Sequence, residues 1–90
     1  MSRKEETAPQ DALFLVWHGG RGTQVSLGDP VHPMAEGLFL VRSARTLSKL
    51  YHAVKRQLPA DTALCVSPLS APPKFKGMEP GALKWLRMNK

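Results

Sequence analysis

Cationic side chains recur along one acid-free stretch of this 90-residue chain. Between Arg42 and Ala60 the sequence contains Lys and Arg residues but no Asp or Glu. If this stretch is helical, positions three or four residues apart share one face, which then carries a basic stripe of Arg45, Lys49, His52 and Arg56. Like charges at this spacing cost each other a few tenths of a kcal/mol. The stripe suits contact with nucleic-acid phosphates, and a solvated helix face is the alternative interpretation.

A second cationic group lies nearer the C-terminus, where Lys74 and Lys76 flank Phe75. An aromatic ring on which a base can stack, beside lysines that contact phosphates, is a pattern found in nucleic-acid-binding surfaces. The alternative is that Phe75 packs in the interior. The predicted nucleic-acid-binding residues are Arg42, Arg45, Lys49, His52, Arg56, Lys74 and Lys76.

Residue types that could support catalysis or metal binding are scattered. His18, His32, His52 and Cys65 do not have the spacing of a usual zinc site. No closely spaced pair of carboxylates suggests hydrolysis. We therefore expect no catalytic residue, no metal site and no cofactor, and a binding protein is a better interpretation than an enzyme.

The glycine-rich loop from Gly19 to Gly22 surrounds Arg21. Exposed backbone amides in such a loop can hold a phosphate, and an ordinary surface turn is the alternative.

The basic stripe requires a helix, which the sequence predicts from Ala44 to Leu58. The apolar residues of this segment share the face opposite the stripe, and they are Leu47, Leu50, Tyr51, Val54 and Leu58. Ser43 or Thr46 can cap the first turn, and Pro59 ends the helix.

Apolar runs predict strands on both sides of this helix. The firm ones are Ala12 to Trp17, Leu38 to Val41 and Thr62 to Val66, while Thr23 to Leu27 reads as a short, half-exposed strand and Met34 to Glu36 as a helical turn. A strand, helix and strand this close together lie side by side or one strand apart in one sheet. A short helix is expected from Gly81 to Met88, after Pro80.

The sequence therefore predicts a small α/β (α+β) fold. We expect an open sheet of three or four strands, ferredoxin-like or truncated ferredoxin-like, with the main helix on one face and a short C-terminal helix. Residues 1–10 are polar and are expected to form a disordered tail, so that residues 11–90 make up the single domain.

Overall charge and cysteine content indicate which partners and which cellular compartment to expect. The formal net charge of +6 favours an anionic partner. No apolar run has the length of a membrane span, and the first residues do not resemble a signal peptide. A single cysteine agrees with a reducing compartment. We expect a cytoplasmic protein with no membrane partner.

From Gly37 onward the order of features resembles that of the SinR-like relatives of the small CRISPR adaptation nuclease Cas-two, a ferredoxin-like family. The resemblance covers about half the chain and rests on Gly37 to Ser43, a helix ending in Leu58-Pro-Ala-Asp, Thr62 to Ser67, and Glu79 to Leu86. Family nucleases bind metal through an acidic residue just after the first strand, where this chain has His18. The family's first helix is replaced here by the loop from Gly19 to Pro33.

Three functional hypotheses follow. The first is a non-catalytic module that contacts nucleic acid, RNA or DNA, through the basic helix face. The second is a protein-interaction subunit that forms a homodimer through the region of Trp17 or Trp85 and a sheet face. The third, implied by the resemblance, is a metal-dependent nuclease.

Overall fold

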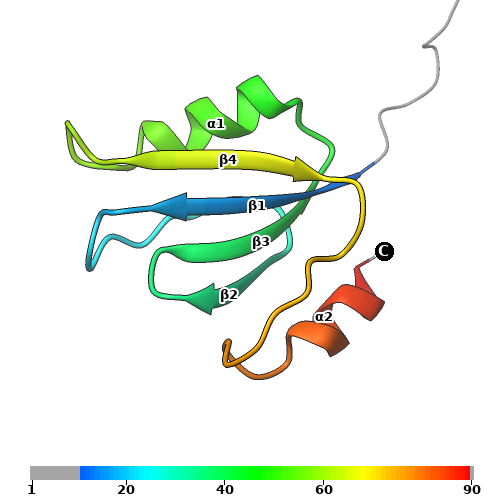
Figure 1. Ribbon diagram of the computed structural model, residues 1–90. Coiled ribbons are helices and arrows are strands. Elements are labelled where there is room, and N and C mark those ends of the chain that lie inside the picture. Colours follow the sequence, from blue (N-terminus) through cyan, green and yellow to red (C-terminus); the bar gives the residue numbers. More distant parts are fainter. Residues whose placement is uncertain (1–10, 90) are drawn as a thin grey trace, which may run out of the picture.

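The apolar runs form the strands of one antiparallel sheet. The structure, a computed structural model, describes residues 11–89; the tail expected at residues 1–10 lies outside them. The elements are β1 (Ala12–His18), β2 (Val31–Ala35), β3 (Leu38–Ser43), α1 (Leu47–Lys55), β4 (Leu64–Leu69) and α2 (Ala82–Met88), as Figure 1 shows.

The strands lie in the order β2-β3-β1-β4, and every neighbouring pair is antiparallel. Because β3 and β4 both flank β1, they run parallel to each other one strand apart, with α1 as their connection. This is a ferredoxin-like arrangement in which the loop of residues 19–30 occupies the place of the first helix. The expected fold class is confirmed.

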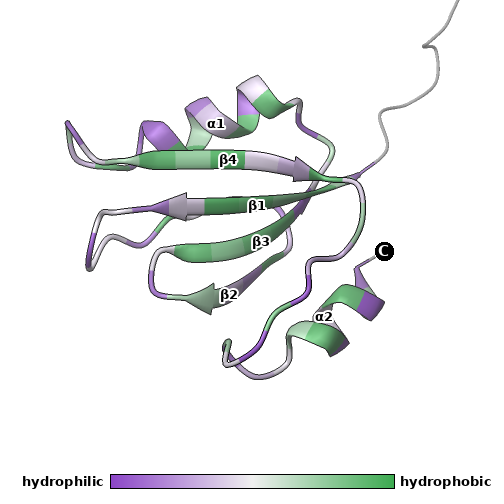
Figure 2. Ribbon diagram, viewed as in Figure 1, coloured by the Kyte–Doolittle hydropathy of each residue, from purple (hydrophilic) through white to green (hydrophobic). Residues whose placement is uncertain are grey.

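The two helices lie on opposite sides of the sheet (Figure 1). On the α1 side, the buried core consists of Phe14, Val16, Phe39, Val41, Leu50 and Val54. On the α2 side, it consists of Leu13, Met34, Leu40, Ala82 and Leu86. Figure 2 shows that hydrophobic residues run along β1 and β3, as expected for strands buried on both faces.

Two side-chain hydrogen bonds shape the start of α1. Thr46 Oγ1 accepts from the Lys49 amide at 3.2 Å, and Ser43 Oγ accepts from the Arg45 amide at 3.0 Å. Of the two residues expected to cap the helix, Thr46 is the N-cap, whereas Ser43 holds the turn that precedes the helix, and regular helix begins after Thr46 rather than at Ala44. As a result Leu47, expected in the core, lies in the first turn and is 42% exposed.

The segment Thr23 to Leu27 was expected to form a strand and forms none. Its backbone is instead held by a side chain: Gln57 Oε1 accepts from the Ser26 amide at 2.7 Å, and Gln57 Nε2 donates to the Ser26 carbonyl at 2.9 Å. The expectation of a helical turn at Met34 was also wrong. Met34 belongs to β2 and is only 2% exposed.

Pro68 interrupts β4 without interrupting its ladder to β1. The Gly19 amide donates to the Ala63 carbonyl at 3.0 Å, so odd-numbered residues of β4 turn their polar backbone groups toward β1. Even-numbered residues turn theirs toward the open edge. The N–H that Pro68 lacks would therefore face outward rather than toward β1. Edge strands tolerate proline at such positions.

Pro33 occupies the equivalent position at the other edge. The Arg42 amide donates to the Pro30 carbonyl at 3.1 Å, so the nitrogen of Pro33 faces away from β3. This edge is also partly covered, because the Glu79 amide donates to the Met34 carbonyl at 2.9 Å. Within residues 11–89, neither helix has the length and apolar content needed to span a bilayer.

Candidate nucleic-acid interface

Exposed basic side chains follow the outer side of α1 to its C-cap, and three of them, Lys49, His52 and Arg56, are here called the α1 ridge. Its two ends are seven positions apart in the sequence, which corresponds to about 10 Å along the helix axis. The opposite side of α1 holds Leu50 and Val54, each fully buried. The packing of α1 on the sheet therefore fixes which way the ridge faces.

Arg45 stands at the start of the ridge but is engaged in an ion pair. Its Nε lies 3.1 Å from Asp29 Oδ2, and the two side chains are 36% and 21% exposed. The nitrogen's hydrogen is not directed at this oxygen, so the contact is an ion pair without a hydrogen bond. The sequence did not predict the ion pair between Arg45 and Asp29, because the loop of residues 19–30 has no hydrophobic periodicity that would indicate where it packs.

Part of the positive charge on α1 has a local structural role. His52 and Lys55 lie in the last turn, where a cation interacts favourably with the helix dipole. Lys55 Nζ also lies 5.8 Å from the centre of the Tyr51 ring. Lys49, by contrast, lies in the first turn, which contains no acidic residue and where the same dipole disfavours a cation. Lys49 is therefore the ridge residue that the helix itself explains least.

The other three predicted residues lie on the α2 side. Arg42 alternates with Val41 along β3 and so points away from α1; its Nε donates to the Asn89 carbonyl at the end of α2. Phe75 packs against the α2-side core, which places Lys74 and Lys76 in that layer, with both side chains exposed. The seven residues thus form two groups separated by the sheet, and Phe75 is packed rather than presented.

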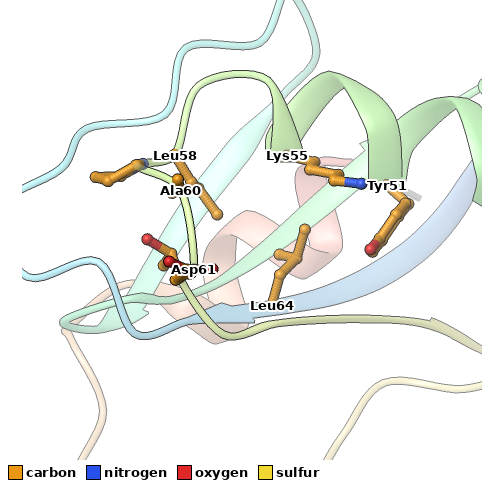
Figure 3. A pocket seen from close by; sticks show the side chains of 8 residues that line it. Tyr51, Lys55, Leu58, Ala60, Asp61 and Leu64 are labelled. Atoms are coloured by element: carbon orange, nitrogen blue, oxygen red, sulfur yellow. The ribbon is translucent and has the colours of Figure 1, made fainter.

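A small pocket lies beside the C-terminal end of α1 (Figure 3). It encloses about 180 Å³ beside Tyr51, Lys55 and Leu64. Asp61 lies on its rim, in a left-handed conformation with φ of 65°. The Asp61 carboxylate makes this pocket a poor receptor for a second anion.

A wider apolar groove of about 480 Å³ lies against α2. Leu83 and Leu86 form its apolar wall, and Arg42 and Arg87 stand at its rim. Because the Arg42 guanidinium already binds the end of α2, this arginine serves the attachment of the helix.

A third pocket, of about 290 Å³, lies where β1 leaves the sheet. Trp17 forms one wall and is 44% exposed, while Arg21 and Glu36 lie at its mouth with Nε and Oε2 4.0 Å apart. Sequence reasoning noted Trp17 and Arg21 but missed Glu36. Only the β2–β3 hairpin brings that carboxylate to the end of β1, and no local signal in the sequence indicates it.

Three amides of the glycine loop are already engaged in hydrogen bonds within the protein. The Gly19 and Arg21 amides donate to the carbonyls of Ala63 and Gly19, at 3.0 and 3.1 Å. The Gly20 amide donates to His18 Nδ1 at 3.1 Å. These bonds make the segment an ordered turn, which is the alternative that the sequence left open.

His18 is only 5% exposed and uses Nδ1 to hold this turn. Over residues 11–89, no three His, Cys, Asp or Glu side chains come together as metal ligands. No protein-family model, no curated protein and no solved structure matches the chain.

Proposed function

We propose that the chain is a non-catalytic module that binds nucleic acid by contacting phosphates through the α1 ridge. The observation that carries the proposal is that Lys49, His52 and Arg56 all face outward from a helix without acidic residues. Such side chains contact several phosphates of one strand without reading its sequence. The net charge of +6 adds long-range attraction to any polyanion.

Arg45 extends the ridge toward the start of the helix. Its partner Asp29 neutralises part of its charge, so its contribution to phosphate binding is smaller than those of Lys49 and Arg56. The ion pair fixes the loop of residues 19–30 against the N-terminal end of α1.

The test is a salt series with duplex and single-stranded DNA and RNA. Each phosphate contact contributes about −0.9 to the slope of log affinity against log salt for duplex DNA, and about −0.7 for a single strand. The ridge should therefore give a slope between about −2 and −3 on duplex DNA. A flat slope, or no binding at low salt, would remove the proposal.

A paired substitution locates the contact. Lys49→Gln combined with Arg56→Gln should flatten the duplex slope by about 2 and weaken binding to every sequence alike. The matched control is Lys74→Gln with Lys76→Gln, which removes the same number of charges from the other side of the sheet. If the control flattens the slope and the α1 pair does not, the proposed surface is wrong.

The competing hypotheses give different results. A homodimer would sediment at twice the mass of the chain, and a nuclease would cleave the same oligonucleotides with magnesium or manganese. The proposed setting is the cytoplasm, where the exposed thiol of Cys65 would remain reduced.

A further inference from the structure

One part of the sheet's α2 side remains uncovered, at the ends of β1 and β4. Trp17 lies there, directly opposite Cys65 of β4, and both side chains are exposed. Leu13 and Leu40, on the same side of the sheet, are buried under α2. An indole that is 44% exposed is an available flat apolar surface.

The Trp17 pocket combines this indole with a fixed polar rim. A Cβ on Gly19 would lie only 3.6 Å from Trp17 Cη2, so the ring lies close over the backbone of the ordered turn. Glu36 belongs to the β2–β3 turn, whose position is set by the His18 amide donating to the Gly37 carbonyl at 2.8 Å. The volume of about 290 Å³ is at the lower limit for ligand pockets, which suits one ring system rather than a larger ligand.

We propose that this pocket binds a guanine base of a single-stranded nucleic acid, an inference that rests on the proposed function and extends it to base preference. The base stacks on Trp17, as bases stack on exposed aromatic rings in single-strand-binding proteins. Its N1–H and N2–H groups donate to the two carboxylate oxygens of Glu36. Arg21 then contacts the adjoining phosphate.

The carboxylate is what favours guanine. An ionised carboxylate only accepts hydrogen bonds, and guanine alone presents two adjacent donors on its Watson–Crick edge. Adenine and cytosine place one donor beside an acceptor, which the carboxylate would repel. Releasing Glu36 from Arg21 costs little, since their side chains are 65% and 89% exposed and their separation is 4.0 Å.

Trp17 can report its own occupancy. The chain has two tryptophans, so Trp85→Phe leaves Trp17 as the sole indole. In this background the four nucleoside 5′-monophosphates are titrated while tryptophan emission is followed. Guanosine monophosphate should quench the emission and bind at least fivefold more tightly than the others. Equal quenching by all four, or none by the guanine nucleotide at millimolar concentration, would overturn the inference.

Two variants identify the contacts. Glu36→Gln should reduce the preference for guanine to within about twofold, because an amide oxygen accepts while its NH₂ opposes a donor. In the Trp85→Phe background, Lys49→Gln with Arg56→Gln should leave mononucleotide quenching unchanged. Guanine-specific quenching without salt-dependent oligonucleotide binding would therefore refute the proposed function alone, and the reverse result would refute the guanine pocket alone.

Discussion

Gly37 shows how one missing side chain sets the geometry beside the Trp17 pocket. It has φ of 75°, and a Cβ at this position would lie 2.4 Å from the carbonyl oxygen of His18. Both the left-handed backbone and the absence of a side chain are needed for the hairpin to meet β1.

Gly37→Ala should lower the free energy of unfolding by roughly 2 to 4 kcal/mol, because backbone strain and a clash with backbone atoms add. Gly22→Ala is the matched control, since Gly22 has φ of 77° and no atom within 4 Å of its missing Cβ. That change should cost about 1 kcal/mol from strain alone. Urea unfolding of both variants measures the difference, and equal losses would show that the contact with His18 contributes nothing.

At the scale of single residues, the sequence predicted contacts between near neighbours in the chain better than contacts between residues far apart in the chain. Thr46 was recognised as a possible cap because a cap acts within three residues of itself. The partner of Arg45 and the carboxylate beside Trp17 were missed, because both come from loops whose placement depends on tertiary packing. The sequence of such a loop has no hydrophobic periodicity from which its place in the fold could be inferred.

At the scale of elements, the periodic patterns determined the sheet and α1 but not the edges. Apolar runs indicated β1, β3 and β4. They missed β2, because Pro33 and His32 interrupt its pattern and the strand pairs on one side only. An edge strand tolerates residues that a central strand excludes, so its sequence resembles a loop.

Pro68 provides a test of how the open edge of β4 is kept from pairing. Pro68→Thr would add one N–H facing outward, next to the outward groups of Val66. The free energy of unfolding should change by less than about 1 kcal/mol, since no ladder bond is involved. Self-association should increase, as measured by sedimentation equilibrium.

Ser67→Thr is the control, because residue 67 turns its backbone toward β1 and the change adds no outward donor. It should sediment as the parent chain does. If Pro68→Thr also leaves the sedimentation unchanged at high concentration, proline is not what protects this edge.

At the scale of the whole molecule, the sheet separates the α1 ridge from the Trp17 pocket. The sequence did not reveal which predicted residues lie on which side of the sheet. The side reached by the loop that carries Lys74 and Lys76 depends on how the chain turns after β4. The seven predicted residues therefore divide between two surfaces, and the one on α1 adjoins the edge at β4. β4 itself carries no charged side chain that would repel a strand passing around it.

A flexible single strand can pass around β4 and reach both surfaces, whereas a duplex cannot bend so sharply. Affinity for single strands containing one guanine should therefore rise more than tenfold between four and sixteen nucleotides, as a second contact becomes intramolecular. Either Trp17→Ala or Lys49→Gln with Arg56→Gln should remove that rise, and duplexes of the same lengths should not show it. A rise merely proportional to length, unaffected by Trp17→Ala, would mean that the two surfaces bind separate molecules.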